Sequence, residues 1–104
     1  MWTLEQGIDL VRSVQSYSRN HKYHVALGGG VVNKGFSDKD VDVYFLPCSN
    51  TKPDQKSSDK IKEMLELLWG ASKPIMGPEY PGDDNYRHKV KFVFEGKRID
   101  AFIV

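Results

Sequence analysis

The chain has 104 residues, of which 15 are Lys or Arg and 14 are Asp or Glu, and its formal net charge is +1. This length suits one domain with one core, and the nearly balanced charge excludes a global field that would attract nucleic acid. The single cysteine, Cys48, excludes an internal disulfide and a cysteine metal cluster. We expect one domain over residues 1–104, and without a leader-like or membrane-spanning apolar run the expected compartment is cytoplasmic.

The first predicted element is an amphipathic helix from about Leu4 to Arg19. Thr3 and Gln6 have the form of a capping box, with a hydroxyl at the cap and an amide three residues later. Apolar residues then recur at helical spacing, at Leu4, Ile8, Val11 and Val14, with Leu10 and Tyr17 beside them. After a polar turn over Asn20 to Tyr23, we expect this helix to cover one face of a sheet.

A strand from His24 to Leu27 is expected next, and it stops at three glycines, Gly28 to Gly30. Because glycine has no Cβ, the main chain at these positions can approach a ligand closely and point N–H groups at an anion. The following segment, Gly30 to Lys39, is predicted to be a loop. Within it Ser37 is either a phosphate contact or a turn former.

The second predicted strand, Asp40 to Leu46, opens with two carboxylates at a spacing of two residues, Asp40 and Asp42. Such positions on a strand face the same way, roughly 6 to 7 Å apart. Two converging carboxylates repel one another and lose solvation, a cost that a bound divalent cation offsets. An acidic strand end without any ligand has the same pattern. The opposite side of the strand is expected to be buried, at Val41, Val43 and Phe45.

A polar connector, Cys48 to Ser57, leads to a second predicted helix that starts at Ser58 as its cap and closes at Gly70. Its apolar stripe consists of Ile61, Met64, Leu65 and Leu68. The segment from Lys73 to Asn85 is rich in proline and has no period, so we expect a long loop, or a loop with a short strand near residues 75–76.

The last predicted element is a β-hairpin formed by His88–Phe94 and Lys97–Val104, which alternate around a turn at Glu95-Gly96 or Gly96-Lys97. One face carries Val90, Phe92, Phe94, Ile99, Ala101 and Ile103, and the other carries Lys91, Val93, Arg98, Asp100 and Phe102. Asp100 is therefore an acid within an apolar strand, and burying it requires a cation. That cation is Lys91, Arg98 or a metal ion.

The glycine turn and the acidic strand together resemble the nucleotidyltransferase superfamily, to which DNA polymerase beta, poly(A) polymerases, CCA-adding enzymes and minimal nucleotidyltransferases belong. The signature of that superfamily is a hydrophobic residue, Gly, Gly or Ser, a gap, and Asp-x-Asp. The matching residues here are Leu27, Gly28, Gly29 and, after the gap, Asp40-Val41-Asp42. The closest resemblance is to the CCA-adding and poly(A) enzymes, which Val31 and Lys39 also fit, whereas Val32 and Asn33 stand where those enzymes have Arg and Asp.

The resemblance implies an α/β (α+β) fold with a mixed sheet of about four or five strands, two helices packed on one face and the acids on the other. It also implies that Asp40, Asp42 and Asp100 are catalytic and hold two Mg²⁺ ions, with Asp100 arriving from a later strand. Gly28 and Gly29 would hold the β and γ phosphates of a nucleoside triphosphate through backbone N–H groups. The implied reaction transfers a nucleoside monophosphate to a hydroxyl and releases pyrophosphate.

Two hypotheses about function remain. The chain is a compact nucleotidyltransferase whose acceptor is RNA, protein or a small molecule, or it is a non-catalytic module that binds a nucleotide or a partner. The three acids favour the first, whereas Val32-Asn33 and the absence of a second domain from these residues favour the second. The acceptor would be held by the long loop, by a partner chain or second copy, or by the basic residues Arg87, His88, Lys89 and Lys91.

Overall fold

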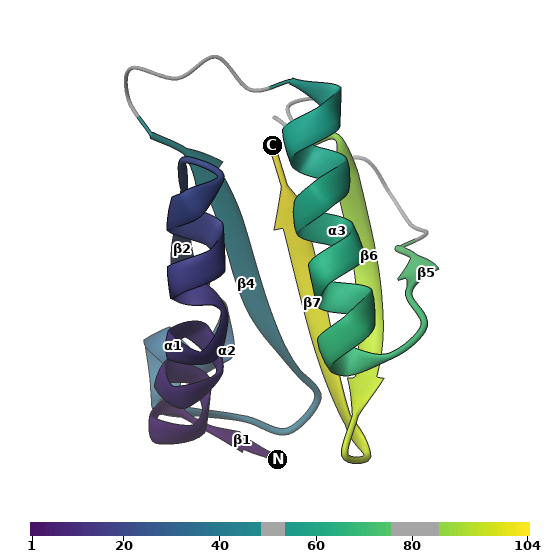
Figure 1. The fold of residues 1–104 in the computed structure, drawn as a ribbon. Helices are drawn as coiled ribbons and strands as arrows, with labels where there is room; N and C mark the ends of the chain where they lie inside the picture. Colours follow the sequence, from purple (N-terminus) through teal and green to yellow (C-terminus); the bar gives the residue numbers. More distant parts are fainter. Residues whose placement is uncertain (49–53, 76–85) are drawn as a thin grey trace.

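The computed structural model describes residues 1–48, 54–75 and 86–104, and every structural statement below refers to these ranges. The elements in chain order are β1 (Trp2–Thr3), α1 (Leu4–Asn20), β2 (Tyr23–Gly28), α2 (Gly30–Lys34), β3 (Phe36–Ser37), β4 (Asp40–Pro47), α3 (Gln55–Trp69), β5 (Lys73–Pro74), β6 (His88–Phe94) and β7 (Lys97–Ile103) (Figure 1).

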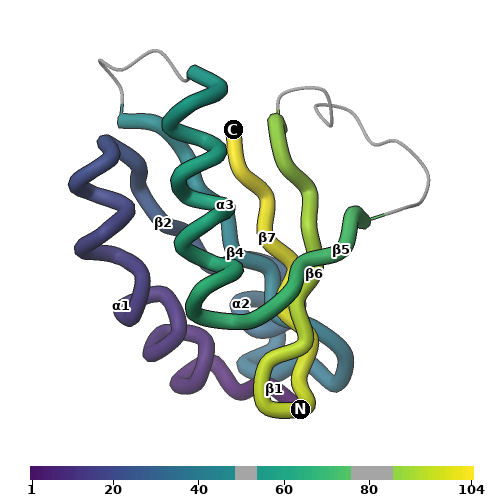
Figure 2. The backbone as a smooth tube through the Cα atoms, turned by 45° about the vertical axis from the view of Figure 1, so that its right-hand side comes forward, coloured from purple at the N-terminus to yellow at the C-terminus, as the bar shows by residue number. Residues whose placement is uncertain are grey.

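The centre of the fold is a five-stranded sheet in the order β2-β4-β7-β6-β5. β4 and β7 run parallel, and the other neighbouring strands run antiparallel. The short strands β1 and β3 form a separate antiparallel pair. Helices α1 and α3 lie on the same face of the five-stranded sheet (Figures 1 and 2). The predicted fold class, an α/β (α+β) fold with a mixed sheet of four or five strands and helices packed on one face, is confirmed.

Helix α1 begins as predicted, because the Thr3 hydroxyl accepts from the Gln6 N–H and the Gln6 side chain accepts from the Thr3 N–H. Its buried stripe differs from the prediction and consists of Gly7, Leu10, Val14 and Ser18. The apolar residues Leu4, Ile8 and Tyr17 are each 39% exposed. Gly7 lets α1 pack closely on β2, since a Cβ there would lie 3.0 Å from a methyl carbon of Leu27 and would require that side chain to shift.

The predicted burial of alternate strand residues is confirmed. Val41, Val43 and Phe45 of β4 are 0% exposed. In the hairpin the buried side chains are Val90, Phe92, Ile99, Ala101 and Ile103, with Phe94 partly buried. Its turn is Glu95-Gly96, with φ values of +53° and +77°. The opposite face of the same strands is therefore the one that is left for polar side chains.

The prediction of a loop over Gly30–Lys39 is wrong, because α2 and β3 occupy most of it. Helix α2 starts after Gly29 and ends at Gly35, whose φ of +83° is the left-handed conformation that terminates helices. The fully buried Val31 attaches α2 to the core. Strand β3 then pairs with β1, which an unstructured loop would not do.

Helix α3 begins one turn earlier than predicted. Its cap is Asp54, whose Oδ1 accepts from the Ser57 N–H at 2.7 Å, and not Ser58. Ser58 is buried inside the helix, where its hydroxyl lies 2.7 Å from the Val104 oxygen and 3.0 Å from the hydroxyl of Tyr23. Tyr23, which we expected in a polar turn, is a core residue of β2 with 1% exposure. Both misplaced residues thus form one buried polar contact between α3 and the sheet.

The end of α3 lies before Gly70, as predicted, but Trp69 is buried while Leu68 is 48% exposed. Strand β5 lies just before the expected position, and the rest of the predicted long loop, from Met76 on, lies outside the described residues. Across the described ranges, no helix combines the length and the apolar character that crossing a membrane requires.

Candidate active site

Three carboxylates meet on the sheet face that the helices leave uncovered. Asp40 and Asp42 stand on β4, and Asp100 stands on the adjacent strand β7, where the parallel register places it beside Asp42. One oxygen from each of the three side chains lies within 4.8 Å of the others. The resemblance to nucleotidyltransferases predicted that these residues come together, and the structure brings them together, although Asp100 lies far from the other two in the chain. We call them the carboxylate cluster.

Asp100 is 6% exposed and is held by a bidentate ion pair with Arg98. The Arg98 Nε donates to Oδ1 at 2.8 Å, and Nη2 donates to Oδ2 at 3.3 Å. The salt bridge that the sequence offered as an alternative to metal binding therefore exists together with the carboxylate cluster. The ion pair with Arg98 balances one of the three carboxylate charges of the cluster.

The pKa of Asp42 is raised to about 6, first by burial and then by the negative charges of Asp40 and Asp100, while Arg98 acts in the opposite direction. Burial also raises the pKa of Asp100, and the ion pair with Arg98 counteracts this rise. Both raised pKa values indicate that the ionised form of the carboxylate is disfavoured in the folded chain. The folded chain disfavours the fully ionised cluster, so binding a cation there is favoured.

The glycine turn touches the carboxylate cluster directly. Gly28 is the cross-strand partner of Asp42, and a Cβ on Gly28 would lie 2.6 Å from the ring of Tyr44. Gly29 has φ +73° and ψ −155°, a conformation that essentially only glycine adopts, and a Cβ there would lie 2.4 Å from Asp42 Oδ2. The two halves of the motif are therefore in contact, since the acid occupies the space that the missing side chain leaves.

A hollow of about 230 Å³ adjoins the carboxylate cluster, and its lining consists of Gly30, Lys34, Phe36, Ser37, Asp38, Lys39 and Asp40. The Ser37 hydroxyl accepts from the Asp40 N–H at 3.3 Å and from the Lys39 N–H at 3.4 Å, so it orders the entry to β4. Lys34 was not identified from the sequence, because the loop prediction gave it no fixed direction. Two lysines therefore border the space beside Asp40.

Three aromatic rings adjoin the carboxylate cluster on the same sheet face. Tyr44 and Phe102 stack at 5.0 Å between centroids, and Tyr86 lies 5.5 Å from Phe102. Burial and the charge of Asp42 raise the pKa of the Tyr44 hydroxyl. No motif in the sequence marks these rings as functional, although strand alternation already places Phe102 on the face of Asp100.

Comparison of the chain with the models of known protein families found no match, and comparison with curated proteins found none either. The relation to nucleotidyltransferases therefore rests on the motif and the geometry of the site, and the family remains a prediction.

Proposed function

We propose that the chain transfers a nucleoside monophosphate from a nucleoside triphosphate to a hydroxyl group, with Mg²⁺ held by Asp40, Asp42 and Asp100. The observation that supports this proposal is the contact between the carboxylate cluster and a glycine turn that has no room for side chains. Such a turn lets phosphate oxygens reach backbone N–H groups within a short distance of the acids.

The donor set fits Mg²⁺, which prefers carboxylate oxygens and usually shares them with substrate phosphates. The raised pKa of Asp42 and of Asp100 supports the same ligand, because a cation relieves the repulsion that contributes to both shifts. Bound Mg²⁺ would neutralise charge on the triphosphate and lower the pKa of the attacking hydroxyl.

The residues around the cluster have distinct tasks in this proposal. The backbone of Gly28 and Gly29 binds the β and γ phosphates, and Ser37 contributes a hydroxyl from the adjoining hollow. Lys34 and Lys39 border that hollow and balance the charge of the phosphates. Together these groups hold the triphosphate in one orientation, which supplies much of the catalytic effect in phosphoryl transfer.

The reaction forms a bond between the acceptor oxygen and the α phosphorus and breaks the bond from that phosphorus to the bridging oxygen of pyrophosphate. Asp100 is the candidate to take the proton of the acceptor hydroxyl, because it lies beside Asp42 on the adjacent strand. The rings of Tyr44, Phe102 and Tyr86 offer a surface on which a nucleobase can stack next to the acids.

One observation favours the second candidate function, a module that binds nucleotides without turnover. Arg98 already contacts both carboxylate oxygens of Asp100. The charge of Asp100 is thereby balanced without a metal ion. A carboxylate that serves as a catalytic metal ligand needs no such ion pair.

The first experiment is thermal unfolding of the chain with and without each nucleoside triphosphate and Mg²⁺. Saturating ligand is expected to raise Tm by about 5 °C or more. Asp42→Asn should remove this rise, whereas the control Glu5→Gln, at an exposed position of α1 outside the carboxylate cluster and the adjoining hollow, should retain it. An equal rise in the Asp42→Asn variant would count against the site.

The second experiment separates the two candidate functions. Triphosphate labelled at the α phosphate is offered together with transfer RNA, short RNA or added protein, and label transfer is measured on gels. Transfer that Asp42→Asn abolishes supports the enzyme. A Tm rise without label transfer to any acceptor supports the module. If there is no Tm rise and no label transfer, both candidate functions are overturned.

A further inference from the structure

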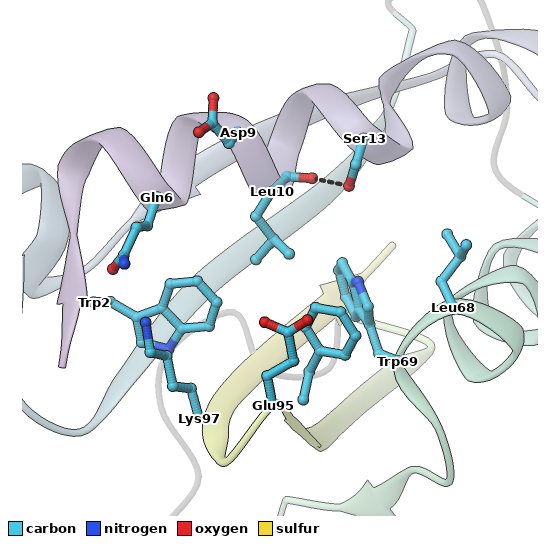
Figure 3. A pocket seen from close by; sticks show the side chains of 10 residues that line it. Trp2, Gln6, Asp9, Leu10, Ser13, Leu68, Trp69, Glu95 and Lys97 are labelled. Atoms are coloured by element: carbon cyan, nitrogen blue, oxygen red, sulfur yellow. Dashed lines mark hydrogen bonds between the residues drawn. The ribbon is translucent and has the colours of Figure 1, made fainter.

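The molecule carries an elongated groove between α1 and α3, on the face opposite the carboxylate cluster. It consists of two adjoining hollows of about 390 and 380 Å³ that share Ser13 and Leu68 in their lining. The first hollow lies where the start of α1, the end of α3 and the β6–β7 turn meet (Figure 3). The second continues along the two helices toward Tyr17. We call both together the helix groove.

The floor of the helix groove is apolar and closed, whereas its edge exposes large apolar side chains. The floor is formed by Trp2, Leu10, Met64 and Trp69, none of which is more than 7% exposed. At the edge Leu67 is 88% exposed, Leu68 is 48% exposed and Tyr17 is 39% exposed. Contiguous apolar surface of this kind, bordered by polar residues, marks interaction sites.

The border of the helix groove is acidic, although the whole chain carries a net charge of +1. Its charged lining side chains are Asp9, Glu63 and Glu95 against Lys97, a local net charge of −2. The Lys97 ammonium lies 5.0 Å from the centre of the Trp2 ring, at one end. The Glu95 carboxylate points into the first hollow (Figure 3). The lining of the groove therefore carries more negative than positive charge, unlike the chain as a whole.

We propose that the helix groove binds an amphipathic helix of a partner protein whose apolar ridge is flanked by Lys or Arg. The ridge would fill the two hollows with side chains at positions i, i+3 or i+4, and i+7, as in other complexes of a helix in a groove. Its basic flanks would face Asp9 and Glu63 on the two opposite banks, and Glu95 at one end. Charge complementarity of this kind selects partners and accelerates their association.

The same charges disfavour a second copy as the occupant. In a symmetric dimer each surface patch meets its own copy, so Asp9, Glu63 and Glu95 would face the same acids. A small ligand is also a weaker match, because the groove is elongated and exposes large apolar side chains along its edge.

The test uses two labelled model peptides of about 18 residues, which is about five helical turns. Both carry a leucine ridge, one with lysine flanks and one with glutamate flanks, and binding to the whole chain is measured by fluorescence anisotropy without nucleotide or Mg²⁺. The lysine peptide is expected to bind at least tenfold more tightly than the glutamate peptide. Similar binding of both peptides, or binding of neither, would overturn the proposal.

Variants at exposed positions locate the binding. Leu67→Ser with Leu68→Ser should weaken the lysine peptide at least fivefold, and Asp9→Lys with Glu63→Lys should transfer the preference to the glutamate peptide. The control Asp38→Lys with Glu66→Lys changes the net charge equally outside the groove lining and should preserve the preference. An equal loss in the control would mean that the peptide senses only net charge, which overturns the proposal.

The oligomeric state tests the remaining possible occupant, a second copy of the chain. The wild-type chain is expected to stay monomeric in sedimentation across the concentrations used for peptide binding. Dimerisation that Leu67→Ser with Leu68→Ser abolishes would assign the helix groove to a second copy and overturn the proposal. Since no arm of this test contains nucleotide, its failure leaves the proposed nucleotidyl transfer untouched.

Discussion

On one face of the sheet Val41, Val43 and Phe45 of β4 are fully buried beneath the helices, whereas on the other face Asp40 and Asp42 of the same strand lie against Asp100. The first face stabilises the fold through apolar burial. The second face lowers stability through repulsion, because burial and like charge raise the pKa of Asp42. One strand thus supplies both the support and the site, and the apolar face offsets the cost of gathering the acids.

The largest expected effect tests the supporting face. Phe45→Ala should destabilise the chain by about 3–5 kcal/mol, because it empties a fully buried position in the core. Leu46→Ala, the next residue of β4 and 38% exposed, should cost less than about 1.5 kcal/mol. Urea unfolding measures both, and equal losses would contradict the assignment of the two faces.

The next prediction concerns the contact between the glycine turn and the carboxylate cluster. Gly29→Ala should destabilise the chain by about 2–4 kcal/mol, because it adds a forbidden backbone conformation to a collision with Asp42. The control Gly35→Ala has φ +83° but meets nothing within 4 Å, so it should cost only about 1–2 kcal/mol. If both variants lost the same stability, the contact with Asp42 would have no energetic consequence.

A smaller effect concerns the cation that the chain itself supplies. Arg98→Met should destabilise the metal-free chain by about 2 kcal/mol, because Asp100 loses two charge-assisted hydrogen bonds. Mg²⁺ should restore part of this loss, since it replaces the missing positive charge. Lys91→Met, at the cross-strand neighbour of Asp100, serves as the control and should change stability little. Chemical unfolding with and without Mg²⁺ measures the difference, and a loss that Mg²⁺ leaves unchanged would contradict a metal site here.

Features that depend only on neighbouring residues could be predicted from the sequence. The alternation in β4, β6 and β7 predicted which side chains face the core, since the period of a strand is two. Helix ends were less predictable, because Asp54 and Ser58 are both capping residues and only packing decided between them. The buried stripe of α1 was predicted wrongly because the spacing of apolar residues does not show how closely the small Gly7 approaches Leu27.

The meeting of the three acids could not be derived from local pattern. It requires β7 to lie parallel to β4, a pairing between distant segments that no period encodes. Only the resemblance to nucleotidyltransferases predicted Asp100 beside the first pair. Alternation in β7 already places Arg98 and Phe102 on the face of Asp100, so both follow as neighbours of the site as soon as this pairing is known.

The smallest expected effect is one that runs against the usual direction, since removing a charged site residue should stabilise the chain. The pKa of Asp42 is raised from 3.8 to about 6 by folding, so between these pH values the folded chain binds more protons than the unfolded chain. Without metal, stability should therefore fall as the pH rises from 4 to 6. Full burial would make the effect about 3 kcal/mol, and water at this half-buried side chain reduces it to about 1 kcal/mol.

Asp42→Asn removes this dependence, so the variant without metal should be more stable than the wild type at pH 7 and nearly equal to it at pH 4. The difference between the two unfolding curves reports Asp42 together with its repulsion from Asp40 and Asp100, since these carboxylates interact with one another. Asp38→Asn is the control and should follow the wild type. Saturating Mg²⁺ should reverse the order at pH 7, because only the wild type keeps all three ligands. An Asp42→Asn chain that is less stable than the wild type at pH 7 without metal would mean that the acid supports the fold, and the contrast between the two sheet faces would then be wrong.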